Sequence, residues 1–349
     1  MPQAAAEDWE ATTPGAAGFA ADLEQRLAQK VEAGGFPQMH GVAVARHGKL
    51  FLERYFSGGD QRWGEPLGRV DFGPEVLHDV RSVSKSVVGL LYGIALAEDK
   101  VPPLDAPLLD HFPYHDLAAD PARRKMTVEH ALTMTLGLDW NETLPYSDPR
   151  NSEVAMEGAG DRYRYILEHP VAAAPGSRWN YCGGATALLA HLIARGCGKA
   201  LHDYAVEKIF TPLGITESAW TLGTNGEEAA ASGLRLTPRG LAKLGQVMLN
   251  QGRWGDRQIV PGAWIADSVT ERVPTDGGLC YGYQWWLGRS PQSQKPWWAA
   301  IGNGGQRLAV FPHLDLVIAV TAGAYNDWDA WQISVRFMTE VLFPALETP

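Results

Sequence analysis

One serine and one lysine in this chain have the spacing of a nucleophile and its activator. Ser82 and Lys85 enclose the tetrapeptide Ser-Val-Ser-Lys, and three residues of helix would place both side chains on one face. No charged residue occurs from Ser86 to Ala97, which predicts a buried helix that begins at the motif. Ser82 would then lie where unpaired N–H groups favour negative charge, and burial would lower the pKa of Lys85. The alternative is a serine that caps the helix and a lysine that reaches solvent.

Tyr181 lies in a second candidate segment, a tight loop between Pro175-Gly176 and Gly183-Gly184. Pro-Gly favours a turn, and the two later glycines permit close backbone approach before the next helix. A tyrosine held there could move a proton if a nearby cation lowered its pKa. The alternative is a buried tyrosine whose hydroxyl is simply satisfied. We interpret Cys182 beside it as a small apolar filler.

A third candidate segment is Gly302-Asn303-Gly304-Gly305-Gln306, which enters a predicted strand. Glycines there would let a substrate lie flat against the sheet, and a backbone N–H would be free to bind an oxyanion. The alternative is a glycine-rich hairpin turn.

Composition and the absence of other motifs narrow the function. The net charge of −10 disfavours nucleic acid and anionic membranes as partners. The sequence has no G-x-S-x-G, H-E-x-x-H or P-loop motif, and its ten histidines lack metal-ligand spacing, so we expect no metal and no cofactor. It has no signal-peptide pattern and no apolar run that spans a bilayer, and its three cysteines are widely spaced. We therefore expect a cytoplasmic protein with reduced thiols, whose oligomeric state stays open.

Predicted strands lie near both ends of the chain and predicted helices fill the middle, which favours an α+β fold. A helix is expected around residues 19–31 and a hairpin over 41–56, followed by helices at 86–97 and 184–195, the last ended by Gly196. Strands are expected at 281–287, 306–311 and 316–321, before a C-terminal helix. The hairpin and the late strands would form one antiparallel sheet flanked by the terminal helices. We expect a loose lead-in at 1–15, a sheet domain at 16–80 plus about 205–349, and a helical domain at about 81–204. The active site would lie between the two domains.

Taken together and in this order, the three segments resemble the serine β-lactamase and penicillin-binding-protein superfamily. That family combines S-x-x-K, a Y-x-N-type loop and a K-T-G-type triad. The stretches 126–138, 210–215 and 234–242 resemble its connecting segments. The resemblance implies that Ser82 is the nucleophile, Lys85 its activator and Tyr181 the general base and acid. It places the oxyanion hole at the backbone N–H groups of Ser82 and Gln306.

Two positions depart from the family pattern. Gly183 stands where the family usually has asparagine, and Asn303-Gly304-Gly305 stand where it has Lys-Thr-Gly. The pattern is similar to the branch that contains 6-aminohexanoate-dimer hydrolases and β-lactamase-like family VIII esterases. It implies a serine hydrolase that cleaves a small ester or linear amide through an acyl-enzyme. The alternatives are a β-lactamase or D-amino-acid peptidase and, more remotely, a non-catalytic binding protein. The residues expected to bind substrate are Asn303, Gly304, Gly305, Gly183, Trp140, Tyr146 and Trp286.

Overall fold

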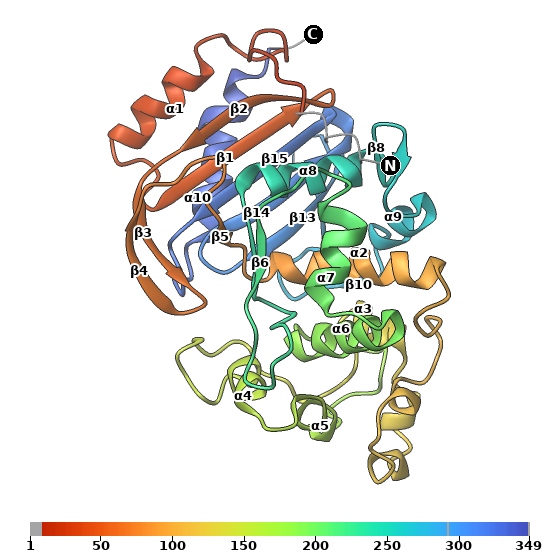
Figure 1. Ribbon diagram of the computed structural model, residues 1–349. Coiled ribbons are helices and arrows are strands. Elements are labelled where there is room, and N and C mark those ends of the chain that lie inside the picture. The colour runs from red at the N-terminus through yellow and green to blue at the C-terminus, as the bar shows by residue number, and fades with distance from the viewer. Residues whose placement is uncertain (1–8, 292, 348–349) are drawn as a thin grey trace.

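The computed structural model describes residues 9–291 and 293–347, and an eight-stranded antiparallel sheet forms its centre (Figure 1). The strands, in their order across the sheet, are β10 (Val273–Pro274), β11 (Cys280–Tyr281), β12 (Trp286–Arg289), β13 (Pro296–Gly302), β14 (Gln306–Phe311), β15 (Leu316–Ala322), β1 (Met39–Arg46) and β2 (Lys49–Tyr55). β1 pairs with both β2 and β15. The predicted union of the N-terminal hairpin with the C-terminal strands in an α+β fold is therefore confirmed.

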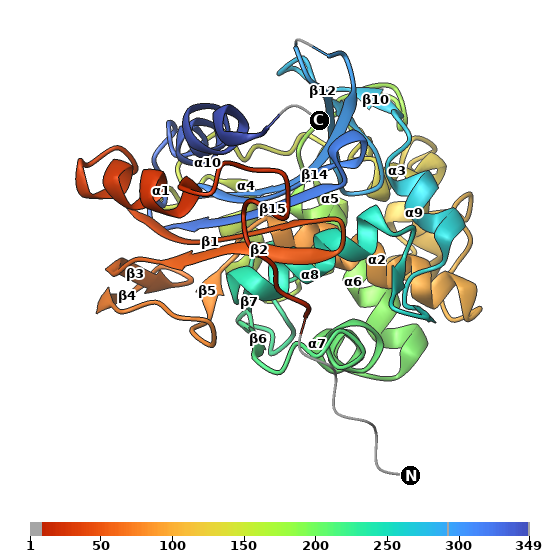
Figure 2. The same cartoon turned by 90° about the horizontal axis from the view of Figure 1, so that it is seen from above.

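Helices cover both faces of the sheet (Figure 2). α1 (Leu23–Glu32) and α10 (Trp331–Arg336) lie on one face, where their apolar side chains join a core with Phe51, Ile318 and Val320. α8 (Pro238–Leu249) packs on the opposite face, against β1, β14 and β15.

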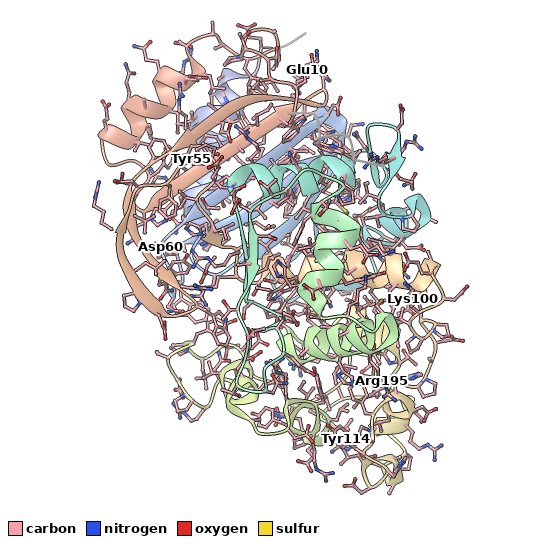
Figure 3. All side chains as sticks on the ribbon, in the orientation of Figure 1. Glu10, Tyr55, Asp60, Lys100, Tyr114 and Arg195 are labelled. Carbon is pink, nitrogen blue, oxygen red and sulfur yellow. The ribbon has the colours of Figure 1, made fainter. Side chains whose placement is uncertain are left out.

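The remaining helices gather beside this second face. They are α2 (Val83–Ala97), α3 (Val128–Leu132), α4 (Ser152–Gly158), α5 (Arg162–Glu168), α6 (Gly183–Cys197), α7 (Leu201–Ala205) and α9 (Gly262–Ser268). α2 is almost wholly buried and contacts α6 as well as β13 and β14. In Figure 3 the labelled Tyr114 and Arg195 lie in this helical region, whereas Tyr55 and Asp60 lie beside the sheet. None of the described helices is long and apolar enough to cross a membrane.

Three small sheets complete the described fold. They are the hairpin β3 (Gly58–Arg62) and β4 (Glu65–Val70), the hairpin β8 (Arg253–Trp254) and β9 (Arg257–Gln258), and a sheet of β5 (His78–Asp79), β7 (Leu234–Leu236) and β6 (Ser218–Trp220). The strands β3 and β4 could not be predicted from the sequence, because their glycine-rich, mostly exposed residues lack the alternation of a half-buried strand.

Two predicted element boundaries were wrong. α6 ends at Cys197 and is capped by Gly198, which has a left-handed φ of 63°, and not by Gly196. Gly196 is needed for packing, because a Cβ there would lie 1.8 Å from the carbonyl oxygen of Lys100. The predicted strand at 281–287 is interrupted, because Gln284 adopts a φ of 64° and Gly282 N–H donates to the Trp285 carbonyl.

Residues 1–8 of the expected lead-in lie outside the described residues. Its following part touches the sheet, since Thr12 N–H donates to the Leu50 carbonyl at 2.8 Å.

Candidate active site

Ser82 lies at a tight turn directly before α2, where β5 meets the helix. Arg81 holds a left-handed φ of 51°, a conformation that costs a non-glycine residue energy and is common at functional sites. Ser84 secures this turn: its hydroxyl donates to the Arg81 carbonyl at 2.6 Å and accepts from Leu234 N–H. The Ser82 hydroxyl makes no capping hydrogen bond, so it is available for other chemistry.

Lys85 is buried, with 1% of its surface exposed. Its Nζ donates to Ser82 Oγ at 3.1 Å and to the Ala231 carbonyl at 3.1 Å, and it lies 3.4 Å from Glu153 Oε2. The alternative of a capping serine with a solvent-reaching lysine is therefore wrong. The ammonium instead lies between the candidate nucleophile and a carboxylate.

The prediction that Lys85 has a lowered pKa was wrong. Burial lowers this pKa, as expected, but electrostatic interactions, led by that with the Glu153 carboxylate, outweigh burial and raise it above its ordinary value. The sequence could not show this, because Glu153 lies 68 residues away. Lys85 is thus an ammonium at rest.

The half-buried Glu142 and the buried Glu153 form a carboxyl pair beside Lys85, and sequence reasoning missed both. Burial and then the charge of Glu153 raise the pKa of Glu142 to about 8. Burial also raises the pKa of Glu153, but Lys85 and hydrogen bonds from Ser232 and Glu142 bring it below its usual range. At neutral pH, Glu153 is therefore the ionised partner of Lys85, and Glu142 is the protonated acid.

Tyr181 lies over the other side of Lys85, with Nζ 4.8 Å from its ring centroid. Burial raises the pKa of Tyr181, and the opposing charge of Lys85 and a hydrogen bond with Ser82 only partly offset this. The expectation of a lowered pKa was wrong, because the phenol is enclosed near two carboxyl groups. Tyr181 is therefore a proton donor at rest.

The space beside Gly183 accounts for the first departure from the family pattern. A Cβ on Gly183 would lie 2.6 Å from Glu153 Oε2 and 3.1 Å from Glu142 Oε1. The carboxyl pair thus occupies the volume into which an asparagine side chain would extend. Gly183 N–H also donates to Glu142, so this backbone position holds the pair in place.

One close approach brings the turn 303–305 to the nucleophile. A Cβ on Gly302 would lie 2.3 Å from the Val80 carbonyl oxygen, so only glycine permits this contact. Gly304 and Gly305 have φ values of 92° and 95°, which favour glycine. The side chain of Gln306 fixes the start of β14 through hydrogen bonds to both backbone groups of Ala322.

Asn303 is bound to the segment that precedes α10. Its Oδ1 accepts from Asn326 N–H at 2.7 Å, and its Nδ2 donates to Asn326 Oδ1 at 3.1 Å. The position therefore offers an oriented, neutral amide where the family has a lysine.

Two cavities meet at Ser82. The first, of about 350 Å³, is lined by residues that include Trp63, Arg81, Glu153 and Ser232. The second, of about 260 Å³, is lined by residues that include Tyr181, Trp286, Gly305 and Arg307. Ser82, Tyr146, Asn303 and Asn326 line both.

Of the three aromatic residues predicted to bind substrate, two line the cavities and one does not. Trp286 and Tyr146 line the cavities, and Trp285, on the other side of its strand, is fully buried. Trp140 is not among the residues that line either cavity. It is buried and donates to Glu142 Oε1 at 2.6 Å, so the structure assigns it a contact with the carboxyl pair.

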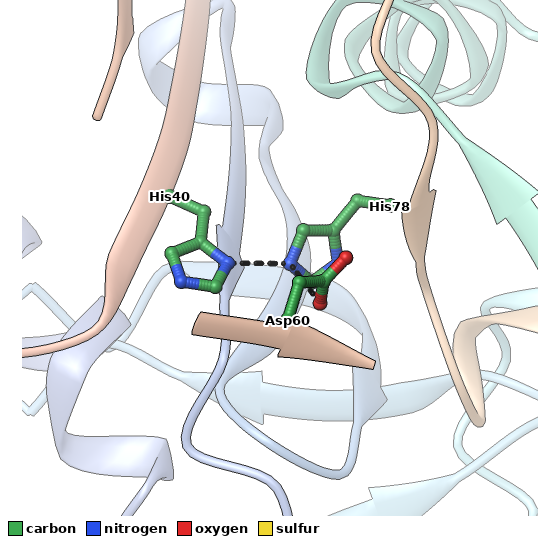
Figure 4. Close-up of side chains that lie close together, drawn as sticks. All are labelled: His40, Asp60 and His78. Carbon is green, nitrogen blue, oxygen red and sulfur yellow. Dashed lines mark hydrogen bonds and ion pairs between the residues drawn. The ribbon is translucent and has the colours of Figure 1, made fainter. Parts of the chain in front are cut away.

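His40, Asp60 and His78 form a buried cluster behind the nucleophile turn (Figure 4). One nitrogen or oxygen of each lies within 4.8 Å of the others, a spacing that could hold a metal ion. Hydrogen bonds between the rings explain these short distances without an ion. His78 Nδ1–H donates to the Asp79 carbonyl, so His78 Nε2 can accept a hydrogen bond from His40 Nδ1 at 2.9 Å. Because this bond uses the atoms that would face an ion, we interpret the cluster as a hydrogen-bonded support for β5.

Comparisons with known proteins show the family to which this chain belongs. Residues 21–329 match the model of the Beta-lactamase family. The chain is 27% identical over 323 residues to a 6-aminohexanoate-dimer hydrolase of Paenarthrobacter ureafaciens. The alignment covers 85% of this chain and 74% of that relative.

Solved structures share the fold. One is EstCE1, described as a hydrolase with promiscuous acyltransferase activity, with a TM-score of 0.72 and 18% identity over 94% of this chain and 98% of that one. Another is a family VIII carboxylesterase, with a TM-score of 0.69 and 15% identity over 93% of this chain and 97% of that one.

The fold and the family match define a serine hydrolase with a β-lactamase-type architecture. The chain belongs to the Beta-lactamase family, is similar in sequence to a 6-aminohexanoate-dimer hydrolase, and shares its fold with a family VIII carboxylesterase.

Proposed function

We propose that this protein cleaves small esters or linear amides through an acyl-enzyme on Ser82. The main support for this proposal is the 3.1 Å contact between Lys85 Nζ and Ser82 Oγ at the junction of two cavities. Glu153 lies on the far side of the ammonium. The departures at Gly183 and Asn303 remove two groups that the family uses for β-lactams, which supports ester or amide substrates.

The proton of Ser82 leaves through Lys85. Because Lys85 is charged at rest, it passes one proton to Glu153 as it takes the proton of Ser82. The serine oxygen then attacks the substrate carbonyl, and the backbone N–H groups of Ser82 and Gln306 bind the resulting oxyanion.

Tyr181 completes the transfer. Its phenol donates a proton to the leaving group as the carbonyl–leaving-group bond breaks, and it regains a proton from Lys85, which recovers its own from Glu153. Water then attacks the acyl carbonyl along the same route, and Ser82 regains its proton. Each half-reaction thus returns Lys85, Glu153 and Tyr181 to their resting states, and the second half-reaction also restores Ser82.

Labelling with a fluorophosphonate, followed by peptide mass mapping, tests this proposal. We expect the adduct on Ser82 and its loss in Ser82→Ala. Ser86 is the matched control, since it lies on the same helix but donates to the Gln284 carbonyl at 2.6 Å; Ser86→Ala should keep the adduct. An adduct on Ser84, Ser86 or Cys182 with Ser82 unmodified would overturn the assignment.

A further inference from the structure

Glu142 joins the loop that precedes α4 to the start of α6. Its Oε1 accepts two hydrogen bonds, one from Trp140 Nε1 at 2.6 Å and one from Gly183 N–H. Its Oε2 accepts from the Tyr146 hydroxyl at 3.2 Å. Because a carboxyl oxygen has two lone pairs, Oε1 is fully used, and the proton of the neutral acid belongs on Oε2.

That proton has an acceptor in Glu153. Both carboxyl groups approach the position that a Cβ on Gly183 would occupy, with Glu142 Oε1 at 3.1 Å and Glu153 Oε2 at 2.6 Å from it. The two side chains share a hydrogen bond. Glu153 Oε2 is also the oxygen that lies 3.4 Å from Lys85 Nζ. Glu142 therefore contacts the carboxylate that takes a proton from Lys85 in the proposed mechanism.

On the basis of the proposed function, we infer that Glu142 is a positioning residue: as a neutral acid it holds Glu153 against Lys85, and as a carboxylate it releases Glu153 and slows the reaction. A second carboxylate would repel the first, because like charges in contact disfavour each other. It would also add negative charge close to Ser82, where the oxyanion develops. The carboxyl pair is therefore active while it shares one proton.

The groups around Glu142 determine which of them changes charge just above neutral pH. Those in the described chain are Lys85 on α2, Glu153 on α4, Tyr181 and Cys182 before α6, Tyr281 on β11 and Tyr146 on its own loop.

Most of these groups keep their charge between pH 7 and pH 9. Burial raises the pKa of the three tyrosines and of Cys182, so all four stay neutral. Lys85 and Glu153 stay charged, because each is the other's counter-ion. Burial and the charge of Glu153 raise the pKa of Glu142 to about 8. Within this set of described residues, Glu142 is the one that ionises over the range.

The pH dependence of kcat/KM tests the inference. Hexyl acetate is a suitable substrate, because its charge does not change with pH, and the hexanol released is measured by chromatography. kcat/KM reports ionisations of the free enzyme, so we expect it to fall by about tenfold from pH 7 to pH 9 in the wild type. Glu142→Gln keeps a neutral donor that cannot ionise, so its kcat/KM should stay constant. Glu142→Asp keeps an acid at a changed position, so its kcat/KM should fall with a shifted midpoint.

Glu157→Gln is the matched control for these variants. Glu157 is a second buried glutamate whose pKa is raised by burial, in this case to about 7, but it pairs with Arg162. Its replacement should leave the fall in kcat/KM from pH 7 to pH 9 in place.

The outcomes separate this inference from the proposed function. A wild-type kcat/KM that is constant from pH 7 to pH 9, a fall that persists in Glu142→Gln, or an unchanged midpoint in Glu142→Asp overturns the inference but leaves the acyl-enzyme proposal standing. Absence of a Ser82 adduct at pH 7 overturns the proposed function itself.

Infrared difference spectra between pH 7 and pH 9 test the same ionisation without turnover. The wild type should lose a protonated-carboxyl band that is missing from the Glu142→Gln spectra. The same band loss in both proteins overturns the inference.

Discussion

Two polar clusters flank the nucleophile turn and differ in the charge that their residues carry. The carboxyl cluster consists of Lys85, Glu142 and Glu153, and the histidine cluster consists of His40, Asp60 and His78. Burial lowers the pKa of His40 to about 4 and that of His78 to about 3, so both rings are neutral near pH 7. Lys85 and Glu153 instead stay charged, because each is the other's counter-ion.

This difference indicates which cluster can move protons. A neutral ring that is hydrogen-bonded to a neighbour holds that neighbour in position. A charged pair in contact with a serine hydroxyl can exchange a proton with it. We therefore expect substitutions in the carboxyl cluster to change kcat, and substitutions in the histidine cluster to change stability.

The largest expected loss of kcat follows substitution of Lys85 or Tyr181. Lys85→Ala and Tyr181→Phe should each lower kcat by several orders of magnitude, and the double variant should lose little more, because residues that act as a unit are non-additive. Steady-state kinetics with a p-nitrophenyl ester measures this, with circular dichroism to confirm folding. Fully additive losses would mean separate roles, and near-normal kcat in Tyr181→Phe would leave Tyr181 a structural residue.

The next largest loss of kcat is expected from substitution of Glu153. Glu153→Gln keeps the shape but removes the proton acceptor behind Lys85, so we expect kcat to fall by roughly 10²–10³-fold. Glu157→Gln is the matched control, since Glu157 is also a buried glutamate of α4 but pairs with Arg162. Equal losses of kcat in the two variants would show that burial of a carboxylate, and not its contact with Lys85, is what matters.

These residues also show how far sequence alone could lead. Ser82, Lys85 and Tyr181 were identifiable because a short motif and its neighbouring buried helix are local features. The hairpin 41–56 and the strand 306–311 were visible for the same reason. The pKa directions of Lys85 and Tyr181 were predicted incorrectly, since they depend on Glu142 and Glu153, which reach the site only through tertiary contacts.

His40 and His78 lie 38 residues apart in the sequence, and nothing in their spacing reveals the contact. Arg307 has the sequence of an ordinary strand residue. Its burial beside Ser334, with no carboxylate partner among the described residues, becomes visible only in the folded chain.

A smaller effect is expected at Asn303. Asn303→Lys adds a fixed positive charge near the reacting carbonyl. It should shift kcat/KM toward a carboxylate-bearing cephalosporin by about tenfold relative to a neutral ester. The measurement is kcat/KM for both substrates at two salt concentrations, because added salt screens the new charge. If the wild type already hydrolyses the cephalosporin as well as the ester, the β-lactamase alternative replaces the ester or amide proposal.

The smallest effect on activity is expected in the histidine cluster. Because the folded-state pKa values of His40 and His78 lie below the usual value of about 6.5, the unfolded chain binds more protons under acid. Their stabilising contribution is present above pH 6.5 and is lost as the pH falls toward 4 and 3.

His40→Gln should therefore reduce the acid sensitivity of the unfolding free energy. It should cost about 1–2 kcal/mol at pH 7.5, since it disturbs a buried hydrogen bond, and change kcat less than about threefold. Urea unfolding at pH 7.5, 5.5 and 4.5 measures this. If the unfolding free energy of the variant has the same pH dependence as that of the wild type, protonation of His40 does not contribute to the loss of stability in acid.

The contact between Gly302 and the Val80 carbonyl has a consequence for how this protein can diversify. It joins the segment before Ser82 to the end of β13 through main-chain atoms alone, with no side chain between them. The alignment of the reacting serine with the strand that follows therefore does not depend on any rotamer in the cavities. Residues such as Trp63, Trp286 or Arg307 can be exchanged to admit a different substrate while the catalytic geometry keeps its dimensions, so that specificity and chemistry are free to evolve separately.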